Sequence, residues 1–149
     1  CIYTDGTYEL KEYLENLKFN PNELFCIRKL TDKLVVSAVY FDGIKGWTMV
    51  KRFHIETSKT NEKQNFITEN TKSKLLFCSV EQQTEVSYQF TLQGKKMEGN
   101  VILEDFIEVK GWKALGNKLS DRKLSKVQAV IKEIVEDKNV DENQQDLFT

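Results

Sequence analysis

A long run of β-branched and aromatic residues, interrupted by one turn signal, dominates the pattern of hydrophobic and polar positions along the chain. In residues 34–53 the run LVVSAVYFDG stops at Asp42-Gly43, and GWTMVKRFHI resumes it after Lys45 with apolar and polar positions alternating. Such runs are typical of β-strands, and Asp-Gly is typical of a tight turn. We therefore predict a hairpin with a basic tip and a basic second strand.

Shorter patterns of the same kind predict strands elsewhere. Residues 1–10 indicate two short strands around Asp5-Gly6. Asn20 is placed to cap a helical turn that begins at Pro21. Further strands are predicted at residues 24–30, 75–80, 86–92 and 101–109, with 75–80 and 86–92 forming a second strand pair.

Three segments have a less decisive pattern. The apolar positions of residues 10–17 also fit one helical stripe. Residues 56–73 are polar and indicate a long connection that packs through Phe66 and Ile67. Residues 123–131 fit either a strand or a helix, and the spacing of their apolar positions slightly favours the helix.

A basic, glycine-containing segment follows the predicted strand at 101–109. Residues 109–120, VKGWKALGNKLS, combine Gly111 and Gly116 with Trp112 and three lysines, which indicates a surface loop. Glycines let a backbone approach another surface, lysines supply positive charge, and an aromatic ring offers a stacking face. This combination suits a phosphate backbone, and it equally fits a basic turn without a partner.

The charge of the chain is unevenly distributed. Residues 1–132 carry 21 basic and 17 acidic residues, a net charge of +4, whereas residues 133–149 carry one lysine and six acids, a net charge of −5. We therefore predict a mildly basic domain over 1–132 and an acidic tail, flexible or helical, over 133–149. The near-neutral total excludes a strongly basic nucleic-acid binder but not a polyanion partner.

Length and cysteine content narrow the class further. At 149 residues the chain is about one domain long, and it contains no apolar stretch that approaches a membrane span. The three cysteines are far apart without a CxxC pair, which argues against a disulfide framework or a zinc site and fits a reducing cytoplasm. Because the chain begins at Cys1 and not at Met, we expect it to be a piece of a longer protein.

The sequence offers little to build a catalytic site. His54 is the single histidine, so a structural or phosphate-contacting role is favoured over a catalytic one. Neither a GxxxxGK[ST] nor a GxGxxG loop is present to hold a nucleotide, and the carboxylates are scattered. We predict no catalytic residue, no metal ligand and no cofactor in this chain.

A faint internal repeat links two parts of the chain. Gly46-Trp47 and Gly111-Trp112 both follow a strand-like segment that carries an acid, about 65 residues apart. Self-similarity at such a period indicates repeated β units, such as the blades of a propeller.

The residues that carry a family resemblance are SAVYFDGIKGWTMVKRF and, some sixty residues later, FIEVKGWKALGNKLS. Together they resemble the carboxy-terminal region of the A subunit of bacterial type IIA topoisomerases, in particular topoisomerase IV of Bacteroidetes-type bacteria. The resemblance implies an all-β fold, a β-pinwheel of propeller-like blades, of which this length leaves room for two or three in a partial array. It implies a cytoplasmic, nucleoid-associated domain that bends or wraps duplex DNA and assists DNA capture for relaxation and decatenation.

The resemblance also implies which residues contact DNA. Residues 110–117 stand where gyrase A subunits keep a basic glycine-rich box, and Lys51 and Arg52 would face the same rim. The predicted contacts are Lys45, Lys51, Arg52, Lys110, Gly111, Trp112, Lys113, Gly116, Asn117, Lys118, Arg122 and Lys123. Trp112 and Leu115 depart from a full box, so DNA engagement without strong chiral wrapping is expected.

The resemblance places the catalytic parts outside this chain. Its expected partners are duplex DNA, the remainder of the A subunit and the ATPase B subunit of a heterotetramer, and the parent complex would use Mg²⁺ and ATP. Near the end of the tail, Gln144, Leu147 and Phe148 lie in QQDLF, similar to peptides that dock on the bacterial sliding clamp. The alternative function is a protein-interaction module whose basic loop meets an acidic partner and whose tail recruits the clamp.

Overall fold

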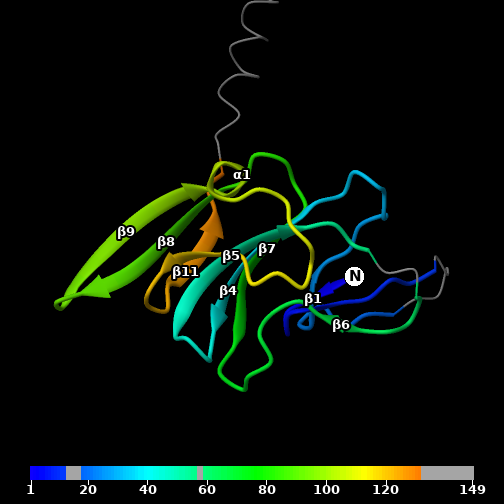
Figure 1. Ribbon diagram of the computed structural model, residues 1–149, viewed down its shortest axis with the longest axis horizontal. Helices are drawn as coiled ribbons and strands as arrows, with labels where there is room; N and C mark the ends of the chain where they lie inside the picture. The colour runs from blue at the N-terminus through cyan, green and yellow to red at the C-terminus, as the bar shows by residue number, and fades with distance from the viewer. Residues whose placement is uncertain (13–17, 57–58, 132–149) are drawn as a thin grey trace, which may run out of the picture.

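Three antiparallel β-sheets pack face to face in a row in the computed structural model, which describes residues 1–12, 18–56 and 59–131 (Figure 1). The first sheet has the order β3-β1-β2-β6, from Leu24–Cys26, Ile2–Tyr3, Thr7–Tyr8 and Gln64–Asn65. The middle sheet has the order β10-β5-β4-β7, from Asn117–Ser120, Trp47–Phe53, Val36–Asp42 and Lys74–Ser79. The third sheet has the order β11-β8-β9, from Ser125–Ala129, Glu85–Leu92 and Lys95–Ile102. The predicted all-β, blade-like fold is confirmed, with three sheets.

The sheets repeat one topology. Each is built on a hairpin, β1-β2, β4-β5 or β8-β9, and the next strand assigned to that sheet pairs with the first strand of the hairpin. In the first two sheets a fourth strand, β6 or β10, returns to the second strand of the hairpin after the chain has made the hairpin of the following sheet. Neighbouring sheets are therefore linked by exchanged strands.

The middle sheet is covered on both faces, which explains its long apolar runs. Six of the seven residues of β4 are buried. One face packs on the first sheet through Tyr40, Met49 and Phe53, and the other packs on the third sheet through Val39 and Val50. A strand buried on both faces has few positions for polar side chains. The hairpin predicted at residues 34–53 is confirmed as β4-β5.

Several smaller predictions are also confirmed. The turn between β1 and β2 contains Gly6 with φ +84°, and Ile67 packs directly over this glycine. Phe66, in the polar connection, is buried between the first two sheets. Asn20 accepts a hydrogen bond through Oδ1 from the Asn22 amide (3.0 Å), so it caps a single turn. The ambiguous segment at 10–17 lies partly outside the described residues.

The predicted pairing of residues 75–80 with 86–92 is wrong. β7 pairs with β4, and β8 turns back at once to pair with β9 along its whole length. The two-residue turn Gln93-Gly94, with φ of +50° and +78°, makes the β8-β9 hairpin. The sequence signal was Gln-Gly between two strand-like runs, a weaker signal than Asp-Gly.

The predicted strand at 101–109 is also wrong beyond residue 102. A short helix, α1 (Leu103–Phe106), follows β9 directly. Leu103 and Ile107 are both buried in the core between the middle and third sheets. The Ile107 amide donates to the Leu103 carbonyl oxygen (3.3 Å), so one helical turn brings both side chains to the same face.

The helix favoured for residues 123–131 is not formed. Residues 125–129 form β11, which pairs with β8 between Val86 and Gln89. Leu124 is buried and Val127 packs on the second core, while the flanking polar residues are exposed. The open hydrogen-bonding edge of β8 thus outweighs a weak local preference for helix.

Gly46-Trp47 and Gly111-Trp112 are not equivalent positions in the repeat. Gly46, with φ +72°, ends the tip of the β4-β5 hairpin, and Trp47 begins β5. Gly111 and Trp112 lie in a loop between α1 and β10. The repeated unit is the hairpin with its exchanged strands, so the predicted repetition of β units holds without the Gly-Trp correspondence.

Candidate nucleic-acid interface

The basic segment 109–120 lies along the outer edge of β5. The Lys110 amide donates to the Arg52 carbonyl oxygen (2.9 Å), and β10 pairs with β5 from Asn117 opposite Val50 onward. Between these attachments, residues 111–116 leave the sheet edge as a loop closed by a turn in which the Ala114 amide donates to the Gly111 carbonyl oxygen (2.9 Å). The segment therefore completes the middle sheet and presents a loop at its rim.

The two glycines of this loop have different tasks. Gly116 has φ +88°, and a Cβ at this position would collide with the backbone carbonyl of Val50. Gly111 is exposed and has open space where a Cβ would be. Only Gly116 is required by the close approach of the loop to β5.

The structure corrects the prediction for Lys51, which is buried and not on the rim. Its side chain is only 3% exposed, and Nζ donates to the carbonyl oxygens of Phe66 (2.6 Å) and Trp112 (2.5 Å). The ring of Phe53 lies 5.2 Å from Nζ. Burial lowers the pKa of Lys51 to about 8. Lys51 therefore holds the loop against the polar connection, and its charge cannot reach a phosphate in this arrangement.

Arg52 is likewise a packing residue. It lies on the opposite face of β5 from Lys51, because successive strand residues alternate. Its Nε donates to Ser37 Oγ (3.2 Å) and its Nη1 to the Ile107 carbonyl oxygen (3.2 Å). The half-buried guanidinium ties the segment after α1 to the middle sheet, which does not support the predicted rim contact.

Trp112 and Leu115 anchor the loop from its two sides. The Trp112 indole is half-buried and meets the Tyr8 ring edge-on, with 5.8 Å between centroids. The Tyr40 hydroxyl donates to the Leu115 carbonyl oxygen (2.6 Å). The Trp112 ring thus packs on the core, and the side chain predicted to stack on a partner fixes the loop.

The remaining predicted cations are at the surface along this edge. Lys45, Lys110, Lys113, Lys118 and Lys123 are exposed, and Arg122 is partly exposed. We call these six residues the cationic edge. Asn117, also exposed, begins β10 among them. Within residues 1–12, 18–56 and 59–131, Arg122 is the member of this set that has a carboxylate at ion-pair distance, Asp121 at 3.6 Å.

Aromatic rings position several of these cations. The ammonium groups of Lys45 and Lys118 lie 5.0 Å and 4.5 Å from the centroid of Trp47. Lys123 Nζ is 5.4 Å from the Phe41 ring. Lysines held over rings lose less side-chain freedom on binding an anion than free ones do. Trp47 and Phe41 point to opposite faces of the middle sheet, so Lys45 and Lys118 lie on one side of this edge and Lys123 lies on the other.

The turn at 121–124 is fixed by a residue that the sequence analysis missed. Thr48 is fully buried, its Oγ1 donates to the Arg122 carbonyl oxygen (2.7 Å), and it accepts from the Leu124 amide (3.2 Å). A threonine in a strand otherwise buried on both faces is the signal that could have indicated it, since a buried hydroxyl needs partners.

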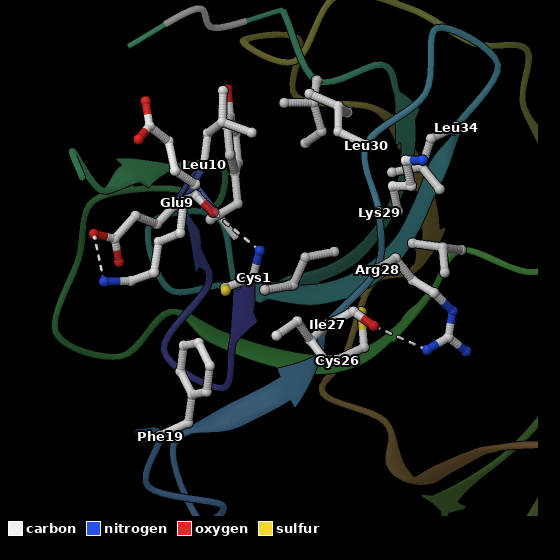
Figure 2. Close-up of a pocket in the computed structure, with 16 residues that line it drawn as sticks. Cys1, Glu9, Leu10, Phe19, Cys26, Ile27, Arg28, Lys29, Leu30 and Leu34 are labelled. Carbon is white, nitrogen blue, oxygen red and sulfur yellow. Dashed lines mark hydrogen bonds and ion pairs between the residues drawn. The ribbon is translucent and has the colours of Figure 1, made fainter. Parts of the chain in front are cut away.

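A large cavity of the described chain lies elsewhere, at the end of the first sheet (Figure 2). It has a volume of about 730 Å³ and is lined mainly by apolar side chains such as Ile2, Ile27 and Leu30. The Cys1 amino group donates to the Glu9 carbonyl oxygen (2.9 Å), and burial raises the pKa of the Cys26 thiol, which disfavours its nucleophilic form. These groups do not form a nucleophile and base pair.

Other chemistry-bearing residues have structural roles. His54 Nδ1 lies 2.9 Å from the Leu34 carbonyl oxygen, to which it donates. Among the residues that the structure describes, no group of three or more His, Cys, Asp or Glu side chains could hold a metal ion. No helix in the described ranges is long and apolar enough to cross a membrane. The predicted tail residues Gln144, Leu147 and Phe148 lie outside the described residues.

Stacked hairpin-based sheets that exchange strands define a propeller-like β-domain, and six of its accessible basic groups lie along one sheet edge. Comparison with protein families agrees with this class: the family described as the topoisomerase C-terminal domain of Bacteroidota matches residues 1–132. The chain belongs to this family and is a topoisomerase-associated domain. Neither a curated protein nor a solved structure gives a significant match.

The different tasks of the two loop glycines lead to a test. Gly116→Ala should lower the free energy of unfolding by about 2 kcal/mol or more, because a left-handed backbone and a collision with β5 act together. Gly111→Ala, the matched control, should change it by less than about 0.5 kcal/mol. Urea unfolding of both variants measures the difference, and equal midpoints would show that Gly116 does not fix the loop.

Burial of Lys51 predicts a pH dependence of stability. The pKa is about 8 in the folded protein and near 10.5 in the unfolded chain, so between these values the unfolded chain binds more protons and stability rises with pH. Relative to Lys51→Met, the wild type should gain up to about 2 kcal/mol between about pH 7 and pH 9.5. Denaturant titrations across this range provide the measurement.

Lys118→Met is the control for this pH effect, because Lys118 is an exposed lysine on the neighbouring strand. Its stability should follow the wild type at every pH. If the free energies of unfolding of the wild type and of Lys51→Met change in parallel with pH, Lys51 does not titrate abnormally.

Proposed function

We propose that this domain binds duplex DNA along its cationic edge, with little readout of base sequence. The observation that carries the proposal is the gathering of six basic residues on one sheet edge, where the described chain supplies a single carboxylate partner, Asp121. A surface cation that is not paired within the protein can neutralise a phosphate without first breaking an ion pair. Lysines contact phosphates as point charges and carry little sequence information.

The setting of the edge favours bending over strong wrapping. Its lysines project from a hairpin tip, a short strand and two turns, all fixed to the middle sheet. A rigid basic surface of this kind holds a duplex against one side of the protein. Lys51 and Arg52 form hydrogen bonds within the protein, so they are not available as DNA contacts. The smaller number of cations at the surface also favours a short contact with DNA over an extended wrap.

Because the domain belongs to a topoisomerase family, its DNA binding would serve the reaction of that enzyme. We propose that the domain helps a type IIA topoisomerase A subunit to capture DNA and to choose its substrate during ATP-dependent relaxation and decatenation. The remainder of that subunit and an ATPase B subunit would be its partners in a heterotetramer, in the cytoplasm at the nucleoid, and Mg²⁺ and ATP would be bound elsewhere in the complex. Recruitment to a sliding clamp through Gln144, Leu147 and Phe148 would be a separate property of the tail.

The salt dependence of DNA affinity tests the proposed contact. Lys110, Lys113 and Lys118 replaced together by alanine should weaken binding to a random-sequence duplex more than tenfold at low salt. The slope of log affinity against log salt should fall by about 3, because each lost phosphate contact removes about 0.9. Fluorescence anisotropy over a salt series gives both quantities.

A control variant with the same change in net charge carries alanine at Lys18, Lys29 and Lys33, three exposed lysines near the first sheet. It should keep the wild-type slope. No binding by the wild type at low salt, or equal losses in the two triple variants, would contradict a contact at the cationic edge.

A further inference from the structure

The β8-β9 hairpin extends beyond the body of the protein as an arm (Figure 1). Its two strands pair over their whole length, from Glu85 opposite Ile102 to Leu92 opposite Lys95. β11 supports β8 only between Val86 and Gln89. Beyond Gln89, the described chain therefore supplies no third strand, and residues 90–97 form a free two-stranded ribbon.

One face of this arm is apolar from the core as far as Leu92 and Met97, and Lys95, which is opposite Leu92, ends this face at the tip. Residues directly opposite in a hairpin share a face, so the paired positions Val86 and Val101, Tyr88 and Gly99, and Phe90 and Met97 are in line. Val86 is fully buried, whereas Met97 and Leu92 near the tip are 40% and 41% exposed. The apolar stripe thus continues past the point where the protein itself can cover it.

The tip is basic. Residues 90–97 include Lys95 and Lys96, both exposed, and no acid. Such a tip would repel the same tip of a second copy of this chain, which disfavours an edge-to-edge dimer of arms. Duplex DNA complements both properties, because its phosphates attract lysines and its grooves accept apolar side chains at sugars, thymine methyl groups and base steps.

The arm is joined to the cationic edge through Arg122. The Arg122 guanidinium lies 5.8 Å from the Phe90 ring, and its Nη1 donates to the Thr91 carbonyl oxygen (2.8 Å). The next residue, Lys123, lies over Phe41 of β4. Basic side chains therefore continue from the hairpin tip of the middle sheet, through the turn at 121–124, to the arm.

We propose that the β8-β9 arm is a second DNA-contacting element, which rests its apolar face in the groove of a duplex held on the cationic edge. Leu92 and Met97 contact the sugars and base edges of the groove, and Lys95 and Lys96 contact the flanking phosphates. Two-stranded ribbons fit DNA grooves, and apolar side chains inserted there bend the duplex. This inference rests on the proposed function and adds to it the element that bends the DNA.

Two arm variants separate the charged from the apolar contribution. Lys95→Ala with Lys96→Ala should weaken duplex binding about tenfold at low salt and lower the salt slope by about 2. Leu92→Ala with Met97→Ala should keep most of the affinity but reduce the DNA bend by about 20° or more. Anisotropy with a short labelled duplex gives the affinity, and energy transfer between dyes on its two ends gives the bend.

Lys29→Ala with Lys33→Ala is the matched control for charge, and it should change the affinity by less than about twofold. All the altered side chains are exposed, so thermal unfolding should be nearly unchanged in each variant. If the wild type binds and both arm variants bind and bend DNA as it does, the arm proposal is overturned while the proposed function stands. If the wild type does not bind at low salt, both are overturned.

Discussion

The open hydrogen-bonding edge of β5 is the constraint on which the rest of this structure depends. β5 is buried on both faces, so its outer backbone groups need partners from the protein or from water. Residues 110 and 117–120 supply these partners, although they follow β5 by more than fifty positions in the chain. Their return places a lysine-rich segment on the rim. The charged surface is thus a consequence of completing the sheet.

The buried side chain of Lys51 holds the same segment, residues 110–120, against β5. A buried ammonium is costly unless its donors are satisfied, and here two backbone carbonyls from separate segments converge on it. One belongs to the connection after β5 and the other to the loop at 111–116. Together with the Tyr40 hydroxyl on Leu115, this contact holds the loop in a defined place. Lys51, which the sequence predicted as a DNA contact, instead fixes the loop whose exposed lysines form part of the cationic edge.

The sequence predicted those parts of the fold whose cause is local. Asp5-Gly6 and Asp42-Gly43 predicted the turns of two hairpins, and the apolar run of β4 predicted a buried strand. The pairing of β7 with β4 and of β10 with β5 could not be predicted, because these pairings depend on edges left open by distant strands. For the site, the basic loop was predicted correctly as a loop at the surface. The burial of Lys51 was not, since alternation along β5 does not reveal that its second face is also covered.

The central claim is that one edge, made of the β4-β5 hairpin tip, the segment 110–116, β10 and the turn at 121–124, is the surface that meets DNA. Its most direct test is a titration of the ¹⁵N-labelled protein with a short random-sequence duplex at low salt, followed by amide chemical shifts. The account predicts that the largest shifts fall at Lys45, Lys110, Lys113, Lys118 and Lys123 and their neighbours, and that residues lining the cavity of Figure 2 barely move. Shifts concentrated around that cavity, or absent from the cationic edge, would contradict it.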